Sequence, residues 1–365
     1  MGYPVVGMAA RRVRIHTRRL AVIVLIAATI TPVFNVLTSE TSVRSAIQGL
    51  IDGIIISLLV VGYLEFLRDG HWRAWFRRLG FWTDLCLSSS IVLALFLLGR
   101  GLGQVVTRHD PRLLVTSLGD AHLLYALPFF VVLAVTIQFA LKMNRMIGVN
   151  VLRYYATGIY HQPTAEERVF LFLDLQGSTQ LAERLGSATY FELLRRFVDD
   201  LTEPLLATDG EIYQYAGDEV VVTWPMALGI REANCVRCFF AIRAAIDREA
   251  ARYARDFGVV PRFRGGLHGG PVTAGELGDL RQQIVFVGDI LNIAARLEAH
   301  AKETGLDLVV SGALLDRIVL PAGVEAAVRG DLAIRGKTVP VKAYSLTEAD
   351  SVTAPALAPS PRGSS

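Results

Sequence analysis

Long apolar runs occupy positions 20–141 of the chain, and an ordinary soluble mixture of residues follows. A membrane-spanning helix needs about 20 mainly apolar residues. Four stretches meet this requirement: Leu20–Thr38, Ala46–Leu67, Phe81–Leu98 and Ala121–Leu141. Four such runs in succession are unusual for core helices of a soluble protein. The pattern therefore predicts an α-helical membrane domain of four transmembrane helices, and Asp52 is expected to make a polar contact inside it.

Basic residues predict how this domain sits in the bilayer, because cytosolic loops carry an excess of Lys and Arg. They cluster before the first run, between the second and third, and after the fourth: Arg11, Arg12, Arg14, Arg18, Arg19; Arg68, Arg73, Arg77, Arg78; Lys142, Arg145, Arg153. Both termini are thus expected in the cytosol, in a multi-pass protein of the plasma or inner membrane. The third loop, with Arg100, Arg108 and Arg112, fits this orientation least well.

The remaining segments divide by composition. Residues 1–19 form a basic cytosolic N-terminus, and residues 142–165 are predicted to be a helical linker that breaks at 161–164. This linker either transmits motion from the membrane or simply joins two domains. Residues 166–348 form the soluble domain. Residues 349–365 are rich in Ser, Pro, Ala and Gly and are predicted to be a disordered tail.

The soluble domain alternates strand and helix patterns. Strands are predicted at Val169–Leu173, Glu211–Tyr215, Val220–Trp224 and Phe263–His268, and helices at Tyr190–Leu206, Arg231–Phe257 and Ile290–Thr304. This mixed order, with a hairpin, favours an α+β fold over a doubly wound sheet.

Charge and cysteine content narrow the possible functions. The net charge is only +3, which gives no reason to propose a nucleic-acid partner. Cys235 and Cys238 form a Cys-x-x-Cys pair inside a helical pattern, and Cys86 lies in an apolar run. Without a second pair of ligands these cysteines are better interpreted as buried helical residues than as a zinc or redox site.

The segment from Phe172 to Thr179 carries the strongest chemical signal. A buried strand delivers Asp174 at its end, Leu175 follows, and Gly177, Ser178 and Thr179 then open a helix. A carboxylate beside free backbone N–H groups suits a metal-bound polyphosphate. Taken alone, the segment is also compatible with a simple capped turn.

Two further segments complete the pattern. Asp218 sits in the turn Ala216-Gly217-Asp218-Glu219 between two strands, where Asp is also common for reasons of turn geometry alone. If Asp174 and Asp218 meet on one sheet edge, they can hold two divalent ions. Asn292 and Arg296 are four residues apart and so share one helix face, which suits either charge stabilisation or plain solvation.

In this order and spacing, the three segments resemble the catalytic domain of class III adenylyl and guanylyl cyclases, over roughly Arg168 to Tyr344. The resemblance implies a ferredoxin-like α+β domain that converts ATP to cyclic AMP and pyrophosphate as a homodimer. It implies that Asp174, Asp218 and the Leu175 carbonyl hold two Mg²⁺ or Mn²⁺ ions per site. Phosphate contacts would come from Gly177, Ser178 and Thr179, and from Arg335 or Lys337. Asn292 would orient the ribose, and Arg296 would stabilise the transition state.

The purine pocket departs from the family pattern. Adenylyl cyclases commonly carry Lys at the position of Gln214 and Asp or Thr at the position of Val285. Gln both donates and accepts hydrogen bonds and so is compatible with adenine or guanine, whereas Val cannot hydrogen-bond. A guanylyl or dual-specificity cyclase, and a non-catalytic nucleotide-binding membrane sensor, are therefore the alternatives. Joint retention of Asp174, Asp218, Asn292 and Arg296 argues against the sensor.

Overall fold

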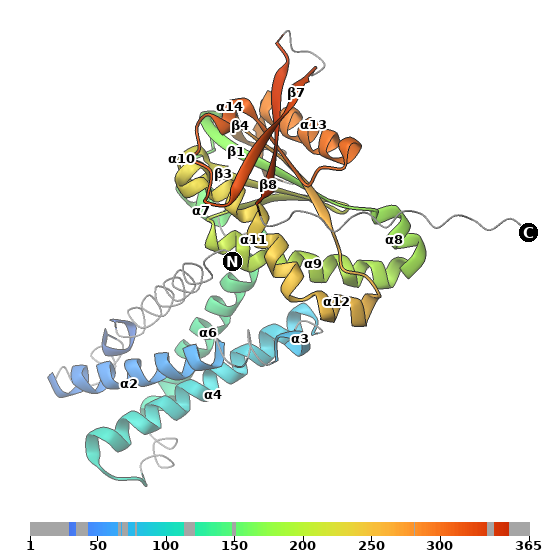
Figure 1. Ribbon diagram of the computed structural model, residues 1–365. Helices are drawn as coiled ribbons and strands as arrows, with labels where there is room; N and C mark the ends of the chain where they lie inside the picture. Colours follow the sequence, from blue (N-terminus) through green and yellow to red (C-terminus); the bar gives the residue numbers. More distant parts are fainter. Residues whose placement is uncertain are drawn as a thin grey trace, which may run out of the picture. The chain divides into compact units, whose positions relative to one another are not determined.

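A computed structural model of the chain describes residues 29–33, 43–64, 67, 72–76, 79–112, 121–147, 151–280, 282–333 and 339–349. The chain divides into two compact units, one up to Leu152 and one from Arg153 onward. In its described part the first unit is helical, whereas the second is built on a sheet covered by helices (Figure 1).

The first unit contains α2 (Val43–Gly62), α3 (Arg73–Phe76), α4 (Phe81–Arg108) and α6 (Ala121–Ile147). Among the described residues, α4 is the one helix long and apolar enough to cross a membrane, and Ala46–Gly62 and Leu127–Met143 are shorter apolar helical segments. Most of the predicted span Leu20–Thr38 lies outside the described residues. The four-span arrangement therefore stays a prediction.

Helix α4 continues ten residues beyond the predicted end at Leu98, through Gly99, Gly101 and Gly103. Gly99 and Gly103 allow α2 to approach closely: an added Cβ would lie 2.6 Å from Ile56 Cγ1 at Gly99 and 1.8 Å from Asp52 Oδ1 at Gly103. Asp52 is buried, as expected of a polar contact inside the bundle, and it accepts a 2.8 Å hydrogen bond from Gln48 Nε2. Small residues that bring helices together are common in membrane proteins.

The described part of the second unit contains eight strands: β1 (Thr164–Leu175), β2 (Glu211–Ala216), β3 (Glu219–Pro225), β4 (Phe263–Leu277), β5 (Gln283–Val287), β6 (Leu308–Ser311), β7 (Val324–Leu332) and β8 (Val341–Glu348). Its helical segments are α7 (Val151–Thr157), α8 (Ser178–Leu185), α9 (Ser187–Ala207), α10 (Met226–Ile230), η3 (Arg231–Ala233), α11 (Asn234–Arg248), α12 (Ala250–Phe257), α13 (Asp289–Thr304) and α14 (Gly312–Leu315). The predicted α+β class is correct for this unit.

The strands form one mixed sheet in the order β2-β3-β1-β4-β6-β8-β7, with β5 paired to β4. β4 and β6 are parallel, and the other pairs are antiparallel. The first four strands, with α8–α9 and α11–α12 between them, follow the β-α-β-β-α-β order of ferredoxin-like folds. This order places β1 at the centre, between β3 and β4.

Side-chain alternation along β1 builds two cores. Val169, Leu171, Leu173 and Leu175 pack in a cluster with residues of α9, α11 and α12. Phe170 and Phe172 point to the other face and join a second cluster that includes Tyr154, Phe286 and Ile290. Because successive strand residues face opposite sides, a strand buried on both faces is apolar throughout, as this one is from Val169 to Leu173.

The predicted helix Arg231–Phe257 is wrong as a single element. The structure has η3, then α11, then α12, with Glu249 between the last two. Glu232 and Ala233 have positive φ angles of 50° and 51°, which no regular α-helix accommodates. This break falls at the start of the predicted helix, and α11 begins directly after it. Cys235 and Cys238 are fully buried in α11, as the helical interpretation expects.

The segment before β1 is also shorter as a helix than predicted. α6 runs to Ile147, α7 covers Val151–Thr157, and β1 already begins at Thr164. Of the predicted tail 349–365, only Ala349 lies among the described residues.

Candidate active site

Asp174 is delivered by the end of β1. It is the penultimate residue of the strand, before the buried Leu175, and its side chain is 13% exposed. Its Oδ2 accepts a 2.9 Å hydrogen bond from Lys302 Nζ of α13. The central strand therefore holds this carboxylate at the surface end of the sheet, beside a cation from a distant helix.

Asp218 is delivered by the turn between β2 and β3. The strands pair up to Ala216 and Glu219, so that Gly217 and Asp218 form a two-residue turn, with Gly217 at φ +67°. A positive φ at this place favours glycine. Asp218 Oδ2 is buried and has no hydrogen-bond partner in the described part of the chain, and a buried acceptor in that state marks a site for a missing donor or cation.

Strand pairing brings the two aspartates together. β1 and β3 are antiparallel, and Leu173 is opposite Val220, so Asp174 and the β2–β3 turn lie at the same end of the pair. The charges of both aspartates act on Glu219, the first residue of β3, which agrees with this placement. Burial, and then the charges of Asp174 and Asp218, raise the pKa of Glu219. Two carboxylates that meet at a sheet edge are a suitable ligand set for divalent ions.

The described residues contain no group of three or more His, Cys, Asp and Glu side chains placed to hold a metal ion. The two carboxylates of Asp174 and Asp218 lie at this edge, and the backbone carbonyl of Leu175 is the next one along β1. The unpartnered Oδ2 of Asp218 fits a cation, and this set would be completed by ligands from outside the chain, such as phosphate oxygens.

The predicted phosphate loop lies directly after Asp174. Gly177 adopts a left-handed conformation with φ +68° and precedes α8, whose first residues are Ser178 and Thr179. No side chain caps this helix, so its first N–H groups are available for other acceptors. Ser178 is half-buried and hydrogen-bonds Tyr190, whereas Thr179 is exposed.

Asn292 and Arg296 both lie exposed on α13, one turn apart. The opposite face of the helix is buried and carries Ile293, Ala294 and Leu297. α13 sits close to the sheet because Gly266 of β4 has no side chain: a Cβ there would lie 2.3 Å from Ala294 O. Asn292 and Arg296 therefore point outward, away from the core of their own chain.

The two predicted purine contacts lie on strands that are not neighbours in the sheet. Gln214 is exposed on β2, which pairs with β3, and Val285 is half-buried on β5, which pairs with β4. Adjacent to them, the rings of Tyr213 and Phe286 pack 5.2 Å apart. Arg335 and Lys337 lie outside the described residues.

Sequence patterns did not identify three charged residues around Asp174. They are Glu219, Glu298 and Lys302. Glu298 is 7% exposed, and burial followed by the charge of Asp174 raises its pKa to about 7. Helical periodicity could have identified Glu298, because it falls on the buried stripe of α13 between Ala294 and Ala301. Lys302 follows four residues later, on the same side of the helix.

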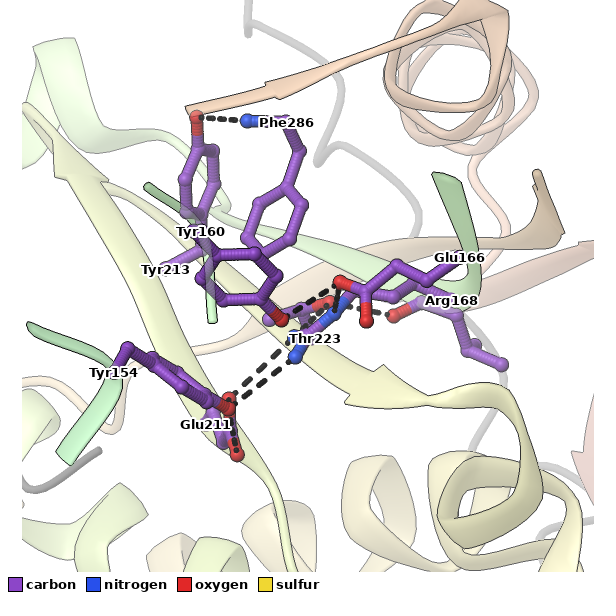
Figure 2. A network of polar contacts seen from close by, with 9 residues as sticks. Tyr154, Tyr160, Glu166, Arg168, Glu211, Tyr213, Thr223 and Phe286 are labelled. Carbon is purple, nitrogen blue, oxygen red and sulfur yellow. Dashed lines mark hydrogen bonds and ion pairs between the residues drawn. The ribbon is translucent and has the colours of Figure 1, made fainter. Parts of the chain in front are cut away.

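A second polar network lies at the other end of β1 (Figure 2). Arg168 is 1% exposed. Its Nε donates to Glu166 at 2.8 Å, its Nη1 to Glu211 at 3.4 Å, and its Nη2 to Tyr154 OH at 3.4 Å. The guanidinium carbon also lies 4.5 Å from the centre of the Phe286 ring. A buried cation thus joins α7, β1, β2 and β5.

The charges of this network compensate one another. Burial alone would lower the pKa of Arg168. The negative charges of Glu211 and Glu166 raise it by more than this, so the pKa of Arg168 lies above its ordinary value. Tyr160 donates to Glu166 at 2.9 Å and is itself buried, and burial raises its pKa. A buried charge with paired, hydrogen-bonded partners is tolerated, whereas an unpaired one is strongly destabilising. The network therefore joins β1, which carries Asp174, to β2, which leads into the Asp218 turn, and to β5, which carries Val285.

Comparisons with known proteins agree with this geometry. Residues 159–348 match the family model "Adenylate and Guanylate cyclase catalytic domain". The chain is 34% identical over 316 residues to adenylate cyclase 2 of Rhizobium meliloti (strain 1021), covering 84% of this chain and 87% of that protein. It is 30% identical over 155 residues to adenylate cyclase 1 of the same organism, covering 41% of this chain but only 23% of that protein.

A solved structure of a bacterial light-regulated adenylyl cyclase has a TM-score of 0.53 at 20% identity, over 63% of this chain and 66% of that chain. At this identity the likeness concerns the fold. The family model matches more than half of the chain, and the alignment with adenylate cyclase 2 spans 87% of that protein. The chain therefore belongs to the adenylate and guanylate cyclase catalytic domain family, the class III nucleotide cyclases.

Proposed function

We propose that the chain is an adenylate cyclase that converts ATP to 3′,5′-cyclic AMP and pyrophosphate. The observation that carries the proposal is the meeting of Asp174 and Asp218 at one end of the β1–β3 pair, with Asp218 Oδ2 buried and unpartnered in the described part of the chain. Similarity to adenylate cyclase 2 over 84% of the chain supports ATP as the substrate.

Asp174, Asp218 and the carbonyl of Leu175 would hold two Mg²⁺ or Mn²⁺ ions. When bound, these ions lower the pKa of the ribose 3′-hydroxyl and neutralise charge on the triphosphate. Two carboxylates at one sheet edge, one of them with a free oxygen, support this assignment.

The other residues of the chain would position the substrate for in-line attack of the 3′-oxygen on the α-phosphorus, with pyrophosphate as leaving group. The free N–H groups at the start of α8, with Ser178 and Thr179, would bind phosphate oxygens. Arg335 or Lys337 would contact the terminal phosphates. Asn292 would orient the ribose, and Arg296 would stabilise the charge of the transition state. Positioning and electrostatics then supply most of the rate enhancement.

We further propose that the active site is shared by two copies of the chain. Asn292 and Arg296 are exposed on the outer face of α13, so a second copy can accept them opposite its own Asp174 and Asp218. A symmetric homodimer would then contain two composite sites, each built from both protomers.

Base selectivity provides the first prediction. Incubation of the purified protein with Mn²⁺ and either ATP or GTP should give cyclic AMP with a modest preference for ATP, because Gln214 fits both bases and Val285 offers no hydrogen bond. An apolar contact discriminates by only about 1–3 kcal/mol, whereas a hydrogen-bonding site can discriminate much more strongly. Gln214→Lys combined with Val285→Asp should therefore increase the ratio of kcat/KM for ATP over GTP.

Chromatographic identification of the product distinguishes the alternatives. Cyclic GMP as the main product would support a guanylyl cyclase, and bound but unchanged nucleotide would support a non-catalytic sensor. Strict ATP selectivity of the native protein would contradict the assignment of Gln214 and Val285 and would indicate that other residues or backbone groups read the base.

The second prediction concerns the membrane. We propose four spans, with both termini and the cyclase domain in the cytosol, because basic residues flank the apolar runs on that side. A reporter fused after Leu141 and one fused at Arg77 should each report a cytosolic location. An extracytoplasmic signal at either position would show that the number of spans is wrong, while a reporter at Arg44 serves as the opposite control.

A further inference from the structure

Lys302 links the last turn of α13 to the proposed metal ligand Asp174. The two residues are 128 positions apart in sequence, and Nζ lies 2.9 Å from Oδ2. The Lys302 side chain is 58% exposed, whereas that of Asp174 is 13% exposed. The acidic partner is thus held in place by the strand, while the ammonium group reaches it from solvent on a flexible stem.

The surroundings of this ion pair are strongly acidic. Asp218 and Glu219 lie on the β2–β3 side, and Glu298 lies on α13 itself. Lys302 places a positive charge beside Asp174 at this acidic edge, which is the same electrostatic task that a divalent ion would perform there.

A second cation faces the same group. Arg264 of β4 is the strand partner of Asp174, and its charge acts on Glu298. Its Nε atom is buried and has no hydrogen-bond partner in the described part of the chain. Arg264 belongs to a central strand, whereas Lys302 stands at a helix end. Of the two cations, Lys302 is the one that can leave without disturbing the sheet.

We infer that Lys302 is the counter-ion of Asp174 in the metal-free protein and that a divalent ion must displace it to bind. The inference rests on the proposed metal role of Asp174. An ammonium group 2.9 Å from Oδ2 repels a divalent cation that approaches the same oxygen. Because its side chain is mostly exposed and has four rotatable bonds, Lys302 can move away at little cost.

Glu298 offers Lys302 a place to go. It lies four residues earlier on α13, so the two side chains are neighbours on one helix face. Glu298 Oε1 is buried and has no hydrogen-bond partner among the described residues. A displaced Lys302 can therefore turn from Asp174 towards Glu298 and pair with that carboxylate while the metal occupies Asp174. Lys302 is a positioning residue in this scheme, because it acts through Asp174 and not on the substrate.

Direct metal titration tests the inference. The full-length protein in detergent is titrated with Mn²⁺ alone, and free Mn²⁺ is measured by electron paramagnetic resonance. Lys302→Met keeps the length of the side chain and removes its charge, so it should bind Mn²⁺ roughly three- to tenfold more tightly. Lys302→Arg should remain within about twofold of the native protein, since it keeps the charge. Lys342→Met, an exposed lysine on β8, should bind Mn²⁺ as the native protein does.

Asp174→Asn separates this inference from the proposed function. If Asp174→Asn binds Mn²⁺ like the native protein, the metal role of Asp174 fails. If Asp174→Asn loses binding but Lys302→Met binds like the native protein, only the counter-ion role fails. The double variant should match Asp174→Asn alone, because Lys302 acts through that carboxylate. A native protein that binds no Mn²⁺ at concentrations that support turnover would overturn both.

Discussion

Asp174→Ala and Asp218→Ala should each remove cyclase turnover while the protein remains folded. Each change deletes one of the two carboxylates that meet at the end of β1 and β3, and the divalent ions they would hold are worth several kcal/mol of transition-state stabilisation. That loss corresponds to roughly a thousandfold or more in kcat. The rate of cyclic AMP formation from ATP, measured at saturating Mn²⁺, checks it.

Stability should respond differently from activity. Asp218 Oδ2 has no partner in the described part of the chain and lies near other acids, so its removal should leave the melting temperature of the metal-free protein unchanged or raised. Asp174→Ala breaks an ion pair with a mostly exposed lysine, which is worth about 0–1 kcal/mol. Asp316→Ala, at an exposed aspartate after α14, is the control and should retain native activity. Near-native turnover of either site variant would refute the metal assignment.

The end of β1 was predicted to within two residues, because the unbroken apolar run stops at Asp174, while the strand itself continues to Leu175. The start of β1 was not. Charged residues precede Val169, so the predicted strand began there, yet the structure extends it to Thr164. Arg168 is buried in this extension only because Glu211, 43 residues away, and Glu166 neutralise it. Such compensation depends on tertiary partners that a local pattern does not contain.

The break in the predicted helix Arg231–Phe257 has a similar origin. The segment contains no Gly or Pro to signal a stop. Of the two left-handed residues, Ala233 is packed in the core, at 1% exposed. Tertiary contacts override local propensity here. Lys302 differs from both cases, since its spacing from Glu298 was visible in the sequence, whereas its contact with Asp174 across 128 residues was not.

Two inactive variants should restore activity when they are made in one cell. Asp174→Ala and Asn292→Ala should each be inactive alone, because every composite site of either homodimer contains a lesion. In a heterodimer, one site combines the intact Asp174 and Asp218 of one chain with the intact Asn292 and Arg296 of the other, and the second site carries both lesions. Exposure of Asn292 and Arg296 on α13 is what makes this sharing possible.

Random pairing gives about half heterodimers with one good site of two, so co-expression should return about a quarter of native activity if sites are independent. The two chains should carry different affinity tags and be co-expressed, since membrane helices can slow exchange between preformed dimers. Tandem purification through both tags isolates the heterodimer, which should then show about half of native activity per dimer. A control heterodimer of Asp174→Ala with Asp218→Ala should stay inactive, because both lesions lie in the same half of the site and neither composite site is intact. If the isolated Asp174→Ala/Asn292→Ala heterodimer shows no cyclase activity, the shared site is refuted. The two aspartates, Asn292 and Arg296 would then act together within a single chain.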